Sequence, residues 1–146
     1  MGVLGELFVA THAAALERAD VLDAGEIPSG AVPHIELTQI GALDLEILGE
    51  VTAREVRYGS GDVEVAEIDL AHDNLYGLPA FLTEVLAAVR ESEDEDVVGD
   101  IARGWADDAE IDASTSDLQE VVSAIVDLAV RATERGEQLY LWTRSV

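Results

Sequence analysis

Residues 116 to 143 constrain the fold most, because they combine an amphipathic helix with a strand. Ser116 and Gln119 match a capping box at the helix start, and Gly136 is the kind of residue that ends a helix. The apolar positions between them recur at helical spacing and define one face, made of Leu118, Val121, Val122, Ile125, Leu128, Ala129 and Ala132. We therefore predict a helix over residues 117 to 135 that buries this face.

Two strands are predicted in addition to this helix. Leucines alternate with aromatic residues in QLYLWT, residues 138 to 143, which favours a strand with both faces at least partly covered. VEVAEIDL, residues 63 to 70, has the β-branched content and the alternation of a strand, and we expect it to be central in the sheet. The large aromatic residues either fill the core between the last helix and the sheet or anchor a partner; they are Trp105, Tyr140 and Trp142.

Apolar periodicity predicts further helices at residues 45 to 53, 78 to 90 and 93 to 104. Asp44 is the expected N-cap of the first, and the second should begin near Gly77, because a proline at position 79 is tolerated only in a first turn. Near the start of the sequence we expect a strand or turn at residues 2 to 10, a short helix capped by Thr11, and a weak strand at residues 34 to 40.

These elements indicate the α+β class. A chain of 146 residues is the size of one domain, and a hydrophobic content of 49% supplies a single core. We predict one domain over residues 1 to 146, with a small, mostly antiparallel sheet and helices packed on one side.

The charge of the chain limits its partners. There are 31 acidic residues against 8 arginines and no lysine, for a net charge of −23. Such a field repels nucleic acid and anionic lipid surfaces and attracts basic proteins and cations. We therefore predict no nucleic-acid or membrane partner, and a basic protein is the kind of partner that fits. A GC-rich genome, a salt-loaded cytosol or a basic target would each explain this composition.

Several functional classes are excluded by what the sequence lacks. Without cysteine there is no disulfide, thiolate nucleophile or thiolate metal site. No apolar run reaches the roughly 18 residues of a membrane span, and MGVLGELFVA lacks the basic region of a secretory signal, so a cytoplasmic location is expected. We predict no cofactor.

Acidic residues are concentrated in two segments, beginning with ESEDEDVVGD at residues 91 to 100. Ser92 and Glu95 match a capping box, so part of this run is explained as the start of a helix, whose dipole favours carboxylates. The alternative is a docking surface for a basic partner. The candidate residues for such a surface are Glu91, Glu93, Asp94, Glu95, Asp96, Asp107, Asp108, Glu110 and Asp112.

Other polar groupings point less clearly to a site. Asp108 to Ser114 resembles the start of an EF-hand calcium loop, but Ala113 and Gln119 stand where that loop needs glycine and glutamate. The three histidines lack a second ligand at metal spacing, and Asp73 beside His72 is better explained as a turn cap than as half of a catalytic dyad. We assign no catalytic or metal-binding residue. Paired carboxylates among Glu64, Glu67 and Asp69 are better explained as a solvated strand face.

Short motifs carry a resemblance to a known family. They are MGVL at residues 1 to 4, Phe8, Gly41, Leu43, Asp44, Gly136, Leu139, Tyr140 and Trp142. In these the chain resembles a family of small uncharacterised proteins of high-GC actinobacteria, which open with MGVL and close with a helix, a glycine and an LYxW strand. It departs from them in WADDAEIDAST, where they have more aromatic residues. The resemblance implies a bacterial, cytoplasmic α+β domain and no particular activity.

Three functional hypotheses follow. The leading one is a non-enzymatic binding module, similar in role to an immunity protein, toxin inhibitor or nucleic-acid mimic, that docks a basic partner through an acidic face. The second is a hydrolase or metal-dependent enzyme built on convergent carboxylates, which requires a concave pocket. The third is salt adaptation without a partner, which spreads acids evenly over all exposed faces.

Overall fold

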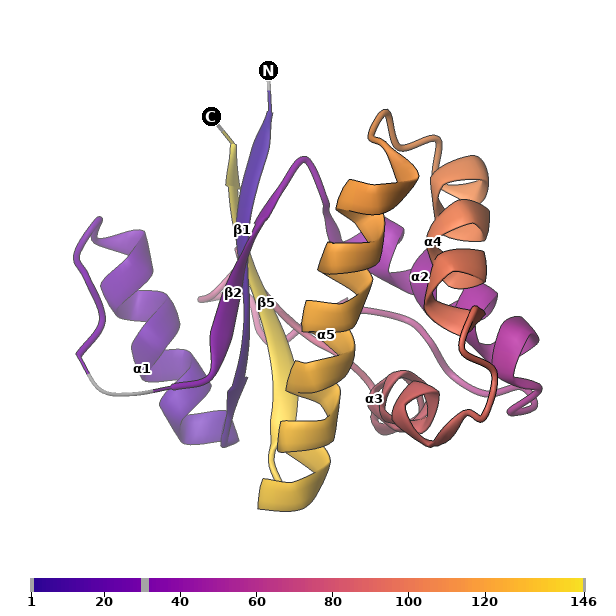
Figure 1. Ribbon diagram of the computed structural model, residues 1–146. Coiled ribbons are helices and arrows are strands. Elements are labelled where there is room, and N and C mark those ends of the chain that lie inside the picture. The colour runs from indigo at the N-terminus through magenta and orange to yellow at the C-terminus, as the bar shows by residue number, and fades with distance from the viewer. Residues whose placement is uncertain (1, 30–31, 146) are drawn as a thin grey trace.

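The computed structural model describes residues 2–29 and 32–145, which form a five-stranded sheet with helices on both faces (Figure 1). The strand order is β2-β1-β5-β4-β3, and each neighbouring pair is antiparallel. The strands are β1 Val3–Ala10, β2 His34–Thr38, β3 Ala66–Glu67, β4 Leu75–Gly77 and β5 Gln138–Ser145. The predicted single-domain α+β fold with an antiparallel sheet is confirmed.

The helices divide unequally between the two faces of the sheet. They are α1 His12–Asp23, α2 Ala42–Val56, α3 Ala80–Ala88, α4 Val97–Asp108 and α5 Thr115–Arg135, with a 3₁₀ turn η1 at Val89–Glu91. The helices α2 to α5 gather on one face, as predicted for the helices expected at residues 45 to 53, 78 to 90, 93 to 104 and 117 to 135, whereas α1 lies alone on the other (Figure 1).

Side-chain alternation along β1 and β5 creates a core on each face of the sheet. Leu7 and Leu141 point into the larger core, which they share with α2 to α5, while Phe8 and Tyr140 point into the smaller core beneath α1. Alanines on the inner side of α1 leave room there for aromatic rings, and the rings of Phe8 and Tyr140 stack with centroids 5.9 Å apart. The smaller core therefore depends on large strand residues and small helix residues.

The large aromatic residues fill the core, but not between the last helix and the sheet alone. Trp105 is fully buried among α2, α4 and α5, and its Nε1 donates to the backbone oxygen of Asp44 at 2.8 Å. Tyr140 and Trp142 lie on the opposite face of the sheet, beneath α1. The core interpretation is thus confirmed, and the expected position is corrected for the two strand residues.

The prediction of a long central strand over residues 63 to 70 is wrong. Only Ala66–Glu67 pairs as a strand, and it lies at the edge of the sheet. The backbone N–H of Val65 donates to Glu46 Oε1 of α2 at 3.2 Å, so this part of the segment is held by a helix side chain. Val63 and Val65 pack into the larger core, whereas Ile68 packs against the smaller core on the other face and Leu70 is exposed, so the alternating apolar residues do not form one strand face. The centre of the sheet belongs to β1 and β5.

The starts of α2, α3 and α5 differ from those predicted. Asp44 is not the N-cap of α2 but the third helical residue, and its Oδ2 accepts from the backbone N–H of the N-cap Gly41 at 2.9 Å. The N-cap of α5 is Ser114 rather than Ser116, since its Oγ accepts from the backbone N–H of Asp117 at 3.1 Å. Helix α3 begins at Ala80 with Pro79 as N-cap, rather than near residue 77.

Candidate functional site

All nine predicted binding residues are exposed, and the structure divides them between the two ends of α4. A helix of 12 residues is about 18 Å long at 1.5 Å per residue. We call these nine residues the α4 acidic surface. It has one part before the helix, Glu91, Glu93, Asp94, Glu95 and Asp96, and one part at and beyond its end, Asp107, Asp108, Glu110 and Asp112.

The acids of the first segment directly precede a helix, as predicted, but the predicted capping box and the helix start near residue 93 are wrong. Helix α4 begins at Val97, after the run of acids, and its N-cap Asp96 makes no side-chain capping bond. Ser92 Oγ accepts from the backbone N–H of Asp94 at 3.3 Å, and Asp94 Oδ1 accepts from that of Asp96 at 2.9 Å. These bonds shape the connecting loop and do not cap the helix. The turn η1 and the loop occupy the residues that the capping-box pattern assigned to the helix.

Few cations neutralise the α4 acidic surface. Residues 91 to 112 contain ten acidic residues and one basic residue, Arg103. Arg103 lies 3.1 Å from Asp100, and Arg54 of α2 lies 3.6 Å from Asp108. Both pairs are exposed, and such pairs contribute little to stability. Most of these carboxylates are therefore free to meet a partner.

The calcium-loop pattern between residues 108 and 114 is not realised. Asp108 turns toward Arg54, and Ser114 caps α5. Within residues 2–29 and 32–145, no group of three or more His, Asp or Glu side chains has the arrangement of a metal site. The exposed carboxylates of this loop do not converge on one point.

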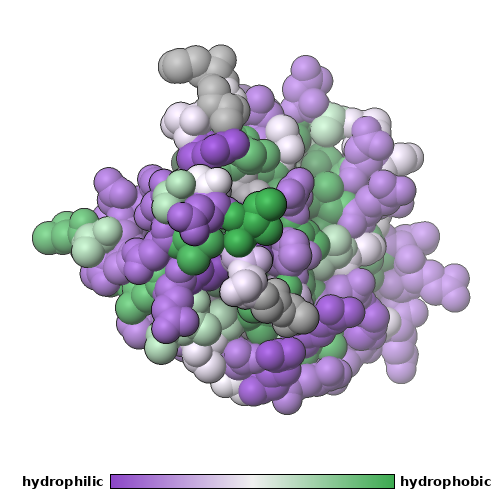
Figure 2. All heavy atoms as spheres, turned by 90° about the vertical axis from the view of Figure 1, so that its left-hand side faces the viewer, coloured by the Kyte–Doolittle hydropathy of each residue, from purple (hydrophilic) through white to green (hydrophobic). Residues whose placement is uncertain are grey.

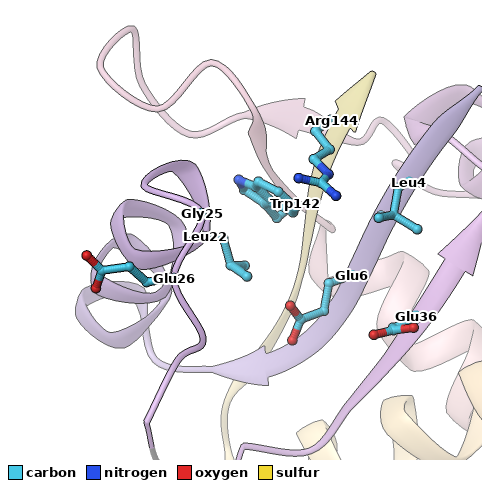
Figure 3. Close-up of a pocket in the computed structure, with 9 residues that line it drawn as sticks. Leu4, Glu6, Leu22, Gly25, Glu26, Glu36, Trp142 and Arg144 are labelled. Atoms are coloured by element: carbon cyan, nitrogen blue, oxygen red, sulfur yellow. The ribbon is translucent and has the colours of Figure 1, made fainter. Parts of the chain in front are cut away.

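A pocket that the sequence did not predict lies between the C-terminal end of α1 and the sheet. Seen from the α1 side, hydrophilic residues cover most of the surface around smaller hydrophobic areas (Figure 2). The pocket has a volume of about 220 Å³ and is lined by Leu4, Gly5, Glu6, Leu22, Gly25, Glu26, Glu36, Trp142 and Arg144. It combines acidic, basic and apolar side chains in a small space (Figure 3).

One of the residues that line this pocket, Glu6, belongs to a buried ion pair. Glu6 of β1 and Arg18 of α1 are each 9% exposed. Glu6 Oε1 accepts from Arg18 Nε at 3.0 Å and also from Arg18 Nη2, while the guanidinium lies 5.2 Å from the centre of the Phe8 ring. Removing one member would leave a buried charge without its counterion, which is strongly destabilising. The pair holds α1 on the sheet and fixes the position of the Glu6 carboxylate.

Two aspartates of α1 also tie this helix to the rest of the molecule. His72 Nδ1 lies 2.8 Å from Asp69 Oδ1, and His72 Nε2 lies 2.9 Å from Asp20 Oδ1 of α1. The bond to Asp69, and less strongly the bond to Asp20, raises the pKa of His72 above its usual value, and the bond to His72 lowers the pKa of Asp69. Asp23 Oδ1 accepts from Trp142 Nε1 at 2.8 Å. The partner of His72 in its own loop is therefore Asp69, from the predicted strand face, and not Asp73.

Sequence reasoning missed the histidine bridge because Asp20 and His72 lie 52 residues apart in the chain, and it missed the pocket because the charged residues there come from different strands. Glu6, Glu36 and Arg144 come from three different strands, and only the strand register places them on one face. The available signal was Glu6 itself, a charged residue within the apolar run GELFVA. A charge inside such a strand indicates a buried partner, but the sequence does not reveal which of the eight arginines it is.

Comparisons of the chain with protein-family models, with curated proteins and with solved structures gave no match. The resemblance to small actinobacterial proteins stays a prediction from short motifs. Among residues 2–29 and 32–145, no helix has the length and apolar character needed to cross a bilayer. Function must therefore be argued from the acidic surface and from the pocket.

Proposed function

We propose that this protein is a cytoplasmic, non-enzymatic binding module that docks a basic protein, as an immunity protein or inhibitor does. The partner would contact the α4 acidic surface. The observation that carries this proposal is the local charge: ten acidic residues against one arginine within residues 91 to 112. Acids make up nearly half of that segment and about a fifth of the whole chain, so the density there exceeds the general acidity of the protein.

The helix that joins the two parts of this surface is anchored in the core of the protein. Ile101, Ala102 and Trp105 anchor the inner side of α4 in the core, and the Trp105 indole is hydrogen-bonded to α2. Side-chain bonds from Ser92 and Asp94 shape the loop before the helix. A preorganised surface loses less conformational entropy on binding, which favours affinity. Lysine and arginine side chains of a partner would meet carboxylates carried on an anchored helix and its flanking loops.

The separation of the two parts indicates the size of the partner. A basic surface would need cations about 18 Å apart to engage both ends of α4. That span suits a folded basic protein. The acidic field would steer the partner toward this side, so association should be fast at low ionic strength and slow as salt screens the charges.

The test compares two variants of equal net charge. The first removes four acids of the α4 acidic surface through Glu93→Gln, Asp94→Asn, Glu95→Gln and Asp96→Asn. The control removes four exposed acids elsewhere through Glu17→Gln, Glu50→Gln, Glu84→Gln and Glu134→Gln. Each protein is immobilised, basic proteins are captured from lysate of the source organism at low ionic strength, and the Kd of any stoichiometric partner is then measured by calorimetry.

We expect the α4 variant to lose about tenfold in affinity, because four exposed charge contacts at about 0.3 to 0.5 kcal/mol each approach 1.4 kcal/mol. The control should keep the wild-type Kd within about twofold. Equal losses in the two variants would show that only net charge matters. That result, or the absence of a basic partner eluted by salt, would refute the proposal.

A further inference from the structure

The pocket beneath α1 brings charges of both signs to one small site on the sheet (Figure 3). Glu36, Glu6 and Trp142 are cross-strand neighbours and form one row across β2, β1 and β5. Leu4 and Arg144 are paired in the next row along β1 and β5. Because successive side chains of a strand alternate between faces, both rows project on the α1 side, about 7 Å apart along the strands. The two carboxylates therefore lie one row from the guanidinium.

The acidic side of the pocket has unused hydrogen-bonding capacity. Arg18 occupies only Oε1 of Glu6, and no other residue of the described chain donates to the second carboxylate oxygen. Glu36 is exposed on the neighbouring strand and makes no ion pair with the described residues. Glu26 lines the rim but directs its carboxylate away from the pocket (Figure 3). Glu6 and Glu36 can thus accept hydrogen bonds from a bound cation.

The opposite side of the pocket offers a cation and an apolar wall. Arg144 is exposed, and none of the carboxylates in the described parts of the chain forms an ion pair with it, although the protein carries 31 acidic residues. Leu22 reaches from α1 toward the sheet, and the Trp142 indole is fixed by its bond to Asp23 (Figure 3). A ligand bound here would meet carboxylates, a guanidinium and apolar carbon at the same time.

We propose that this pocket binds a free α-amino acid. Its ammonium group would bond to Glu6 and Glu36, its carboxylate to Arg144, and its side chain would pack on Leu22 and Trp142. An α-amino acid carries its ammonium and carboxylate groups on one carbon. This short separation suits a site in which the Glu6 and Glu36 carboxylates lie one row from the Arg144 guanidinium. The volume of about 220 Å³ is below the roughly 300 to 1,000 Å³ of pockets for drug-sized ligands, so nucleotides and larger cofactors are too big.

The charge of the whole protein favours a zwitterion over a simple anion. With a net charge of −23, the protein repels carboxylic acids that lack an ammonium group. A simple amine would be attracted to the acidic side of the pocket, but the positive charge of Arg144 would repel it. The Arg144 guanidinium would also remain unpaired. The proposal does not rest on docking at α4, because α4 lies on the other face of the sheet (Figure 1).

The first experiment screens ligands by NMR. Each of the standard L-amino acids is added at millimolar concentration to the ¹⁵N-labelled protein, and amide shifts are mapped. We expect at least one apolar amino acid to shift the amides of Glu6, Glu36 and Trp142, with a Kd below about 1 mM. The amino acid that binds is then compared with two analogues, its two halves, one without the carboxylate and one without the ammonium group. For L-leucine these are 3-methylbutylamine and 4-methylpentanoate. Both halves should bind at least about tenfold more weakly.

The second experiment uses matched variants, because Glu6→Gln would leave Arg18 buried without a counterion and could unfold the protein. Arg144→Gln should weaken amino-acid binding about tenfold, because it removes the cation that pairs with the ligand's carboxylate. It should strengthen binding of the amine, because it removes the positive charge that repels the amine. Glu36→Gln should weaken both ligands. The exposed controls Glu134→Gln and Arg131→Gln, both on α5 and away from the pocket, should leave both Kd values within about twofold.

Two results would overturn the proposal. The first is the absence of pocket shifts with every amino acid. The second is an amine that binds as tightly as its amino acid with no response to Arg144→Gln, which would show that the pocket recognises only a cation. The crossed response to Arg144→Gln, weaker for the amino acid and stronger for the amine, would establish recognition of both charged groups.

Discussion

His72 joins two segments of the molecule that no backbone hydrogen bond joins directly. Its ring lies between Asp69 of its own loop and Asp20 of α1, at 2.8 and 2.9 Å. Both ring nitrogens can donate only when the imidazole is protonated, so the full bridge exists as an imidazolium between two carboxylates. The strength with which α1 is held on the sheet should therefore depend on pH.

The direction of this dependence follows from the pKa of His72, which Asp69 and then Asp20 raise in the folded state. A raised folded pKa means that the stabilisation is complete below the unfolded pKa of about 6.5 and is lost as pH rises through the folded pKa. We expect the free energy of unfolding of the wild type to fall, between about pH 6 and about pH 8.5, more than that of His72→Gln. Urea denaturation across this range, with exposed His12→Gln as control, measures the difference.

The ¹H chemical shifts of the His72 ring provide a second measurement. Their titration midpoint should lie above the usual value for a histidine side chain. Identical pH dependence of stability in the wild type and in His72→Gln would show that the bridge does not hold α1.

At the scale of the elements, the start of α5 shows that the residue selected by a local sequence pattern can differ from the residue that caps the helix in the structure. The sequence contains Ser114 and Ser116, and the capping-box pattern selects the second. In the structure the backbone of Ser114 is extended, with φ −68° and ψ 152°, and its hydroxyl caps the helix. Ser116 is already inside the helix and exposed.

Substitution of the two serines distinguishes these assignments. We expect Ser114→Ala to lower the free energy of unfolding by about 1 kcal/mol, within a range of about 0.5 to 2, because the N–H of Asp117 loses its acceptor. Ser116→Ala should change it by less than about 0.5 kcal/mol. Chemical denaturation with a common m-value measures both. A larger loss for Ser116→Ala than for Ser114→Ala would contradict the observed cap.

The elements that could be predicted are those whose pattern is local. The apolar face of α5, the stop at Gly136 and the strand after it all appear where the sequence places them. The strand predicted at residues 63 to 70 was wrong because the alternating apolar residues do not share one surface: Val65 packs into the larger core, Ile68 packs against the smaller one, and Leu70 is exposed. The three-residue strand β4 is too short to leave a pattern. The residues of the α4 acidic surface could be predicted as exposed, whereas the pocket depends on register between distant strands.

At the scale of the whole molecule, repulsion among carboxylates dominates the electrostatics. The net charge is −23, and the exposed arginine pairs are few and weak, such as Arg54 with Asp108. Acids are exposed on α1, α2, α3 and α5 as well as around α4. The folded chain holds these charges closer together than the unfolded chain does, so charge repulsion favours unfolding.

Salt should therefore stabilise the fold. The Debye length falls from about 30 Å at 0.01 M to about 8 Å at 0.15 M, which is short compared with the molecule. We expect the free energy of unfolding to rise with NaCl over this range, and to rise less in the variant with Gln at positions 17, 50, 84 and 134. Urea denaturation at several salt concentrations measures both slopes. A stability that falls with salt would mean that attractive pairs outweigh the repulsion.

The place of β5 in the sheet matters for how the chain is made. On the ribosome, β1 and β2 are synthesised early and β3 and β4 later, but only β5 lies between the two pairs and joins them. Until β5 emerges, β1 and β4 each present an open edge, and open edges are where nascent chains aggregate or recruit chaperones. Because β5 is translated after both of its neighbours, the sheet cannot close until β5 has left the exit tunnel.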